Sequence, residues 1–460
     1  MNSLKDYLRQ KKFFEQGVAH ATLDPKGPGA VTLHLVPPPP SLFKDPPSLL
    51  IIDGMYFLTV GPSWAANLRI FLSELTSRHG SGKELNKEDV EVIEEAVAKK
   101  VMKLYPKANR KKILEDLKEI VTLSISIAKG WPVPPEIESG MLIKQYAKYM
   151  TAPHRMDLIV SPMSLNRKRR CPLNCKNCYA EQPSMNIEEE LTTQEWMTII
   201  KKCKNANIPM ITFTGGEPLM RSDIVNLVNY SKWFITRMNT NGYLLTADLA
   251  KKLFEASLDS IQITLYSNDP AIHDSLVEKT GAWERTVEGI KNALDAGLSV
   301  SVNTPLVGQN SDYCETLKFL YEIGVRCVTC SGLIATGGAK QQIKNGKDLD
   351  ADSLQALLSK ATKVCEDLGM EISFTSPGCL PSEEILKMGF HSSPVCGACL
   401  SNMAIDPKGN VVPCQSWLNG ENAGNMITDD WSKIWNNPLC KKIRRDCATK
   451  PQCPLKKGGI

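Results

Sequence analysis

Three cysteines, Cys171, Cys175 and Cys178, stand close together in one short segment of the chain. Thiolates are ligands of zinc and of iron–sulfur clusters, and a structural zinc site normally closes with four protein ligands. Three cysteines without a fourth nearby can hold three irons of a 4Fe–4S cube and leave the fourth iron open to a substrate or cofactor. The spacing therefore predicts a reactive cluster, with a purely structural metal loop as the alternative.

The composition is that of an ordinary globular protein. The chain has 460 residues, of which 42% are hydrophobic and 23% are charged, and its formal net charge is +5. This length allows two or three domains, and so small a charge indicates neither nucleic-acid nor membrane binding. The sequence contains no apolar run long enough to span a membrane and no recognisable signal peptide, so we expect a cytoplasmic protein.

Cysteine usage is the unusual part of the composition. All 15 cysteines lie from Cys171 onward, and seven of them fall between Cys379 and Cys453. In a cytosolic chain of this size, such usage favours metal ligation over a framework of disulfides.

Residues 155–345 alternate between strand and helix patterns. The expected strands are Met156–Pro162, Met210–Thr214, Trp233–Asn239, Ser260–Tyr266, Ser299–Thr304 and Val325–Leu333, with helices near 193–206, 222–231, 246–256, 282–296 and 312–323. Such repeats predict an α/β fold with a partial (β/α)6 barrel over residues 151–345. Barrels of this kind place their chemistry at the carboxyl ends of the strands, and the three-cysteine loop directly follows the first strand.

A second motif, Gly215-Gly216-Glu217-Pro218, ends the second expected strand. Alone it is weak evidence, since Gly-Gly also occurs in ordinary turns. Together with the CxxxCxxC spacing of the cysteines, it makes the chain resemble the radical S-adenosylmethionine (SAM) enzymes. The resemblance implies that Cys171, Cys175 and Cys178 bind a 4Fe–4S cluster and that SAM coordinates its open iron. It also implies that Gly215, Gly216 and Glu217 hold the SAM amine.

Later strand ends continue this resemblance. It implies SAM contacts for Asn241, Thr264, Lys279 and Asn303, although relatives often carry serine at the position of Thr264 and arginine near Lys279. The segment Thr336–Ala339 resembles a glycine motif that passes the adenine, and a plain loop is the alternative.

The last part of the chain, residues 346–460, opens with a helix expected near 352–369 and carries a second cysteine pattern. Cys399, Gly409 and Cys414 fit the CX9–15GX4C signature of the SPASM and twitch domains, in which the glycine allows a tight hairpin. The resemblance implies at least one auxiliary 4Fe–4S cluster, with Cys396, Cys399, Cys414 and either Cys447 or Cys453 as ligands. Arg444 and Lys457 replace two cysteines of the full pattern, so a second cluster stays open, as does a zinc ribbon on Cys396 and Cys399.

Residues 1–150 contain no cysteine and include the proline run 37–40, which favours a stiff extended connector. Runs at Ala30–Val36, Leu49–Asp53 and Met55–Val60 predict strands, and helical spacing predicts helices near 63–78, 86–104 and 108–129. This order predicts an α+β domain that resembles the winged-helix recognition element of RiPP enzymes. RiPPs are ribosomally made, post-translationally modified peptides, and the recognition element binds them before their modification. A helical cap over the barrel is the alternative.

Two further features have two interpretations each. Cys330, on the sixth expected strand, is either a small buried hydrophobe or a hydrogen-atom donor to a substrate radical. The basic run Arg167–Arg170 is either a solvated face or a contact for an acidic leader peptide.

The sequence is therefore interpreted as a radical SAM enzyme with a SPASM-like domain. The resemblance implies cleavage of SAM to a 5′-deoxyadenosyl radical that abstracts a hydrogen atom from a peptide, to give a thioether or carbon–carbon crosslink or an epimer. The expected partners are a ribosomal precursor peptide and a flavodoxin- or ferredoxin-type electron donor. The alternatives are oxidation of a protein side chain, as in anaerobic sulfatase maturation, or of a small molecule. An iron–sulfur electron carrier would leave the Gly-Gly-Glu motif unexplained.

Overall fold

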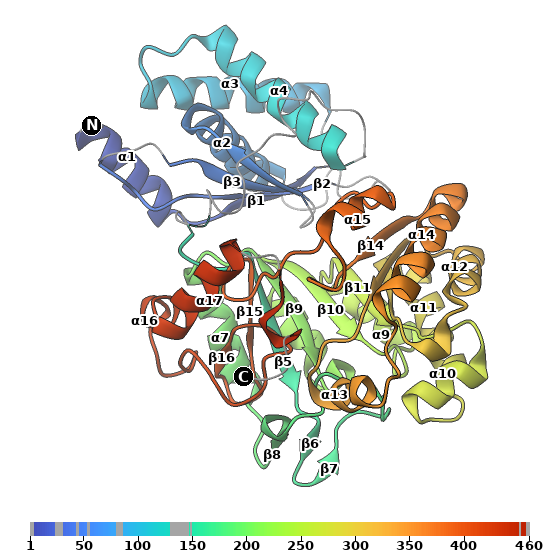
Figure 1. Cartoon of the computed structure of the whole chain (residues 1–460). Helices are drawn as coiled ribbons and strands as arrows, with labels where there is room; N and C mark the ends of the chain where they lie inside the picture. Colours follow the sequence, from blue (N-terminus) through green and yellow to red (C-terminus); the bar gives the residue numbers. More distant parts are fainter. Residues whose placement is uncertain are drawn as a thin grey trace. The chain divides into compact units, whose positions relative to one another are not determined.

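The computed structural model describes residues 4–23, 31–42, 46–52, 56–79, 86–128, 147, 150–449 and 452–456. The chain divides into two compact units, residues 1–152 and 153–460, and each contains its own β-sheet (Figure 1). Within the described ranges, no helix combines the length and the apolar composition needed to cross a membrane.

The first unit is an antiparallel sheet with helices packed on it. Its strands Ala19–Leu23 (β1), Val31–Val36 (β2), Ser48–Ile52 (β3) and Tyr56–Val60 (β4) lie in chain order across the sheet. Helix Leu4–Glu15 (α1) precedes them, and Pro62–His79 (α2), Lys87–Leu104 (α3) and Arg110–Ala128 (α4) follow. Leu33 and Leu50 of the sheet share one buried core with Leu68, Ile93 and Ile120 of the three later helices.

In the first unit, the expected strands and helices are present wherever the structure describes them. A few of their expected end residues lie outside the described residues, namely Ala30, Asp53, Met55 and the residue after Ala128. Strand β1 and helix α1 were not expected. The sequence of β1, Ala-His-Ala-Thr-Leu, has little β-branched character, and its strand form depends on antiparallel pairing with β2.

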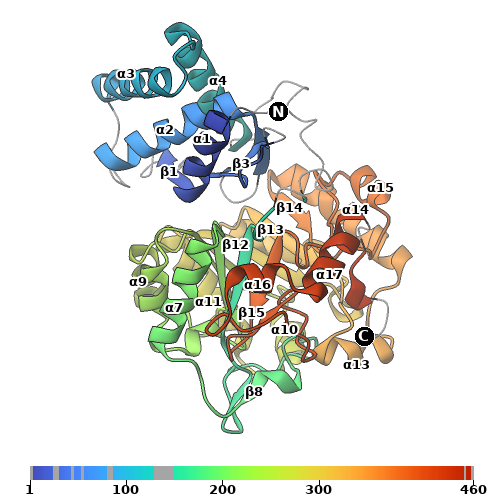
Figure 2. The same ribbon diagram turned by 90° about the vertical axis from the view of Figure 1, so that its left-hand side faces the viewer.

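The second unit is built on one sheet of nine strands, and six of these are the parallel strands of the partial barrel. In chain order they are Arg155–Ser161 (β5), Met210–Gly215 (β9), Ile235–Thr240 (β10), Ser260–Thr264 (β11), Ser299–Pro305 (β12) and Cys327–Ser331 (β13). Helices Thr193–Asn205 (α7), Ile224–Tyr230 (α8), Ala247–Glu255 (α9), Ala282–Asp295 (α11) and Tyr313–Glu322 (α12) connect them. Figure 2 shows α7, α9 and α11 on the outside of the strands. The expected partial barrel is confirmed.

The cysteine-rich region continues the barrel sheet at both edges. After helix Ala351–Leu368 (α14), strand Glu371–Phe374 (β14) pairs in parallel with β13. At the other edge, Asn402–Ile405 (β15) pairs in parallel with β5, and Val411–Val412 (β16) pairs antiparallel with β15. The remaining helices of this region are Ser382–Lys387 (α15), Trp431–Trp435 (α16) and Pro438–Thr449 (α17). The sequence did not predict this continuity, because β14 to β16 are too short to show a strand period.

Two short helices at the catalytic end of the barrel were also not expected. Helix Pro270–Val277 (α10) begins at a proline, and Asp269 caps it by accepting hydrogen bonds from Ala271 N and Ile272 N. Helix Gly337–Lys344 (α13) begins with two glycines, which are poor helix formers.

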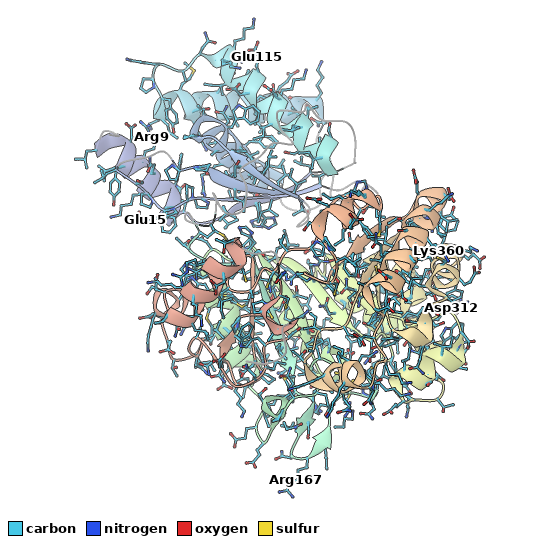
Figure 3. All side chains as sticks on the ribbon, in the orientation of Figure 1. Arg9, Glu15, Glu115, Arg167, Asp312 and Lys360 are labelled. Carbon is cyan, nitrogen blue, oxygen red and sulfur yellow. The ribbon has the colours of Figure 1, made fainter. Side chains whose placement is uncertain are left out.

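The basic run lies on a hairpin of strands Ser164–Leu165 (β6) and Lys168–Arg169 (β7), which join Asn186–Ile187 (β8) in a small sheet. Asn166 and Arg167 form its turn with φ angles of 49° and 63°, as a type I′ turn requires. Arg167 points away from the body of the unit (Figure 3). Arg169 instead turns back to the cluster loop, where its Nε donates a hydrogen bond to the Leu173 carbonyl at 2.9 Å.

Arg221, just after the Gly-Gly-Glu motif, joins three parts of the barrel. It donates to the carbonyls of Val160 and Leu191, each at 3.2 Å, and forms a two-point ion pair with Asp223. Only 7% of its surface is exposed.

We expect Arg221→Met to lower the free energy of unfolding by about 3–5 kcal/mol, because it leaves Asp223 without its cation and two carbonyls without their donor. Arg285→Met, which removes an exposed arginine 3.9 Å from Glu288, should cost less than about 1 kcal/mol. Urea denaturation of both variants measures the difference, and equal stabilities would contradict this account of Arg221.

Candidate active site

A cavity of about 670 Å³ opens into the barrel of the second unit. Most of the residues that the sequence singled out line it together: Cys171, Cys175, Cys178, Gly215, Gly216, Glu217, Asn241, Thr264, Asn303, Cys396, Cys414 and Cys453. The two cysteine groups, which are more than two hundred residues apart in the chain, therefore face one space.

The three-cysteine loop is held between the end of α10 and the start of α13. The backbone N–H groups of Asn174 and Lys176 donate to the carbonyls of Val277 and Leu276, both at 2.9 Å. On the other side, Gly338 N donates to the Cys178 carbonyl at 2.8 Å. The last carbonyls of a helix have no partner inside it, so the loop satisfies groups of α10 that would otherwise lack hydrogen bonds.

The glycines of the Thr336–Ala339 motif lie against this loop. A Cβ atom on Gly337 would stand 2.3 Å from the Cys178 carbonyl oxygen, and one on Gly338 would stand 2.6 Å from that of Lys176. Both distances are too short for any side chain, so the close approach of α13 to the loop requires glycine at both positions. A role in passing the adenine stays a prediction.

The three thiols of the loop fit a 4Fe–4S cluster. They come from one short loop and face one cavity, and burial raises the pKa of Cys171 to about 12 and raises those of Cys175 and Cys178 as well. Such thiols stay protonated near neutral pH unless a metal displaces the proton. Each sulfur of a cubane binds a different iron, which suits three separate positions along a loop.

Glu217 joins the Gly-Gly-Glu motif to the turn after β10. Its carboxylate is 1% exposed and accepts from Thr240 Oγ1 at 2.6 Å, from Asn241 N at 2.9 Å and from Leu219 N at 3.0 Å. Burial raises its pKa to about 6 even though these hydrogen bonds favour the charged form. The Asn241 amide in turn donates to the Cys171 sulfur at 3.6 Å, so the turn also contacts the cluster loop.

Gly215 and Gly216 allow β9 to end close to β5. A Cβ atom at either position would stand 2.4 Å from a backbone oxygen, that of Ser161 for Gly215 and that of Pro162 for Gly216. The structure therefore supplies a packing reason for both glycines, and their expected contact with the SAM amine stays a prediction.

Of the three other expected SAM contacts, two line the cavity and one does not. Thr264 and Asn303 line the cavity, and Asn303 Oδ1 accepts from Thr329 Oγ1 at 2.9 Å. Lys279 is exposed beyond the end of α10 and is not among the residues that line the cavity.

Cys330 is fully buried on the face of β13 that packs against the helices, whereas its neighbours Thr329 and Ser331 face the cavity. Burial and the nearby Cys365 raise the pKa of its thiol. We therefore do not propose Cys330 as a hydrogen-atom donor, because the alternation of side chains along a strand directs it away from the cavity.

The auxiliary cysteines form two neighbouring sets. Cys396 lies against Cys447 and Cys453, and Cys414 is close to Cys396 and Cys453. Cys399 instead lies with its sulfur 3.6 Å from that of Cys440. The hairpin at Gly409, where φ is +85°, returns the chain so that Cys399 N donates to the Pro413 carbonyl at 3.1 Å, next to Cys414.

Arg444, which stands where the full cysteine pattern has a ligand, has a structural role. Its Nε donates to the Cys399 carbonyl and its Nη2 to that of Trp435, both at 2.8 Å. Its guanidinium also lies 3.3 Å from the centre of the Trp435 ring. The arginine thus fixes the backbone that presents Cys399, and Lys457 lies outside the described residues.

Sequence reasoning missed the deeper lining of the cavity, which includes Arg155, Thr212, Arg237 and Gln262. A signal was present, since β11 reads Ser-Ile-Gln-Ile-Thr. Parallel strands buried on both faces are usually apolar throughout, so polar residues at every second position indicate a strand with one face in a polar cavity.

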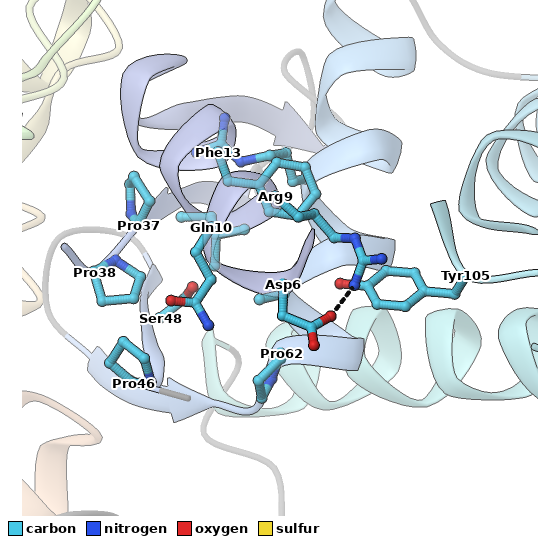
Figure 4. Close-up of a pocket in the computed structure, with 13 residues that line it drawn as sticks. Asp6, Arg9, Gln10, Phe13, Pro37, Pro38, Pro46, Ser48, Pro62 and Tyr105 are labelled. Atoms are coloured by element: carbon cyan, nitrogen blue, oxygen red, sulfur yellow. Dashed lines mark hydrogen bonds and ion pairs between the residues drawn. The ribbon is translucent and has the colours of Figure 1, made fainter. Parts of the chain in front are cut away.

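The first unit has a smaller cavity of about 230 Å³, between α1, the proline-rich segment and the start of α2 (Figure 4). Arg9 donates to Asp6 at 3.0 Å on one side and lies 4.3 Å from the Tyr105 ring centre. Arg69 also lines this cavity, donates to the Gly17 carbonyl and lies 5.6 Å from the Phe13 ring centre. Among the described residues no carboxylate pairs with Arg69, and burial lowers its pKa to about 10.

Comparison with known proteins agrees with this geometry. Residues 165–320 match the model of the radical SAM superfamily, and residues 396–455 match that of the SPASM iron–sulfur cluster-binding domain. The chain carries a radical SAM domain followed by a SPASM domain. The first binds a 4Fe–4S cluster and SAM, and the second binds auxiliary iron–sulfur clusters.

Individual relatives of this radical SAM chain share only part of their length with it. It is 31% identical to the AdoMet-dependent heme synthase of Oleidesulfovibrio alaskensis over 38% of this chain and 45% of that protein. It is 32% identical to the PqqA peptide cyclase of Streptomyces rochei over 33% of this chain and 42% of that protein. The chain spans about half the length of the heme synthases it matches.

The fold as a whole is similar to that of SuiB from Streptococcus suis, solved with the precursor peptide SuiA. The TM-score is 0.58 at 16% identity, over 86% of this chain and 87% of that chain. At this identity the likeness concerns the fold.

We expect Gly338→Ala to weaken the cluster loop, because its Cβ would overlap the Lys176 carbonyl and cost about 1–3 kcal/mol of strain. The variant should retain less iron and sulfide per chain after anaerobic reconstitution. Gly308→Ala is the matched control, since a Cβ there stands 3.8 Å from its nearest neighbour. Equal iron content in the two variants would show that α13 does not support the loop.

Proposed function

We propose that this protein is an enzyme that cleaves SAM and modifies a peptide by radical chemistry. The observation that carries the proposal is the single cavity lined by the three-cysteine loop, the Gly-Gly-Glu motif and three auxiliary cysteines. When it is reduced and has SAM bound, a 4Fe–4S cluster would supply the electron that cleaves SAM to methionine and a 5′-deoxyadenosyl radical.

The protein's own residues bind, orient and shield these groups. Cys171, Cys175 and Cys178 hold the cluster, and the Asn241 amide tunes it through its hydrogen bond to the Cys171 sulfur. Glu217 holds the turn that carries Asn241. With Gly215 and Gly216, it is also the proposed contact of the SAM amine. Thr264 and Asn303 are the proposed contacts to the rest of SAM. Cys396, Cys414 and Cys453, with Cys447 beside them, are the proposed ligands of an auxiliary cluster at the other side of the cavity.

Three observations support a peptide substrate. The first unit has a separate core and a cavity in which Arg69 lacks a carboxylate partner among the described residues. SuiB, whose fold is similar, was solved with a precursor peptide, and one of the relatives is named for cyclising a peptide. We therefore propose that residues 1–150 recognise a ribosomal precursor peptide and that the barrel forms a thioether or carbon–carbon crosslink in it, or an epimer. A cytoplasmic flavodoxin or ferredoxin would donate the electron.

A second candidate function is oxidation of a small molecule. Several relatives are named as heme synthases, and one as an Fe-coproporphyrin III synthase. Oxidation of a side chain on a folded protein, as in sulfatase maturation, is the other alternative.

The first test is SAM cleavage by the reconstituted, dithionite-reduced protein, with 5′-deoxyadenosine as the readout. Cys175→Ala should abolish the product and lower the iron content, because the two thiolates that remain are too few to hold the cluster. Cys203→Ala, which removes a buried cysteine on α7 that is not among the residues lining the cavity, should leave both unchanged. Complete lack of cleavage by the unmodified protein would refute the proposal.

A second test separates the peptide from the small-molecule substrate. Residues 1–152 are expected to bind a short peptide encoded beside this gene, and Arg69→Met should weaken binding about tenfold by removing a charged donor. Arg110→Met, at an exposed ion pair on α4, is the control. Fluorescence anisotropy with labelled peptide measures both, and absence of any affinity in the unmodified unit would favour the small-molecule function.

A further inference from the structure

The middle of the barrel cavity contains a layer of charged and polar side chains on three adjacent strands. In the parallel register, Asp157 of β5 and Arg237 of β10 both lie opposite Thr212 of β9. Residues in register on neighbouring strands project to the same side, so these three side chains lie side by side at one depth. Arg155, two residues before Asp157 on the same face of β5, completes the group.

Only one of the two arginines in this layer is neutralised. Arg155 forms a two-point ion pair with Asp157, with Nε to Oδ1 at 2.8 Å and Nη2 to Oδ2 at 3.3 Å. Arg237 lines the cavity, and within the described part of the chain it makes no hydrogen bond or ion pair. The two arginines and one aspartate of the layer therefore sum to one positive charge. Burial and the positive charge of Arg155 lower the pKa of Arg237, and the negative charge of Asp157 offsets this only in part.

Thr212 adds a second unsatisfied group at the same place. Its side chain is 3% exposed and lines the cavity, yet its Oγ1 has no hydrogen-bond partner. A buried hydroxyl without a hydrogen-bond partner and a half-buried guanidinium without an ion pair both cost free energy, and one bound anion that contacts both would satisfy them. A carboxylate has the shape and charge for this, because it accepts two parallel N–H bonds from a guanidinium.

The position of the layer along the strands separates it from the SAM end of the cavity. Arg237 of β10 lies four residues before Asn241, which begins the turn after this strand, and an extended chain of that length spans roughly 13 Å. The carboxylate of SAM, held at the cluster end, is therefore too far away to be the anion in question. The carbon atom attacked by the radical must lie between the two ends.

We propose that Arg237 and Thr212 form a subsite that binds a carboxylate of the substrate and so positions the attacked C–H bond within the barrel cavity. This inference rests on the proposed function only in taking the barrel cavity as the substrate site. In a peptide the carboxylate belongs to an acidic side chain or to the chain terminus near the modified residue. In a small molecule it belongs to a carboxylate substituent.

Matched probes test the subsite in the reconstituted full-length protein with SAM present. The peptide arm compares N-acetylglutamate N-methylamide with the corresponding glutamine derivative. The small-molecule arm compares coproporphyrin III with its tetramethyl ester. Equilibrium dialysis should show about tenfold tighter binding of the charged member of at least one pair, and the arm in which it appears identifies the source of the carboxylate.

Arg237→Met should remove that preference, and Arg237→Lys should retain part of it. Arg285→Met, which removes a charge from the outside of the barrel, should change nothing. SAM affinity should be equal in all four proteins. Equal binding of both members of both pairs, a preference that survives in Arg237→Met, or weaker SAM binding by that variant would each overturn the subsite.

Thermal unfolding distinguishes a binding residue from a structural one. Arg237→Met should unfold at the same temperature as the unmodified protein or at a higher one, because it removes a half-buried charge that forms no ion pair with the described residues. Arg155→Met should unfold at a lower temperature, because it leaves Asp157 unpaired. A marked loss of stability in Arg237→Met would overturn the proposal. Failure of SAM cleavage would instead refute the proposed function and leave the carboxylate preference standing.

Discussion

The main-chain hydrogen bonds on the two sides of the three-cysteine loop are the constraint on which the site depends. The loop has little regular structure of its own, and its conformation is set by the last carbonyls of α10 and by the Gly338 N–H of α13. Both helices follow from the ends of barrel strands, so the barrel determines where the three sulfurs lie. The Asn241 amide, which the buried Glu217 carboxylate holds in place, extends the same support to Cys171 itself.

Different groups line the barrel cavity at the strand ends and deeper inside. The strand ends carry the cluster loop, the glycines and the turn that Glu217 holds, and these are the parts implied for SAM. Further down, polar side chains such as Gln262, Thr329 and Arg237 replace the apolar layers that fill a closed barrel. A cavity lined in this way must be filled by water or by a polar ligand, which agrees with a substrate site enclosed within the barrel.

The sequence predicted the barrel well, because each strand and each connecting helix has a clear period. Most of the site residues that it singled out, through motifs at strand ends, line the cavity. It could not predict α10 and α13, whose Pro and Gly beginnings are typical of loops. It gave Cys330 a position on a strand but not a face, and only the pairing of β13 with its neighbours shows that this thiol points into the helix layer.

The addition of β15 to the barrel sheet has a mechanical consequence. The hairpin between Cys399 and Cys414 is joined by a parallel ladder to β5, the strand that leads into the cluster loop. Cys399 and Cys414 are thus attached to the same hydrogen-bonded sheet as the strand that leads into the cluster loop. Electron tunnelling falls steeply with separation, so a framework of this kind keeps the rate of exchange between two redox centres constant from one turnover to the next.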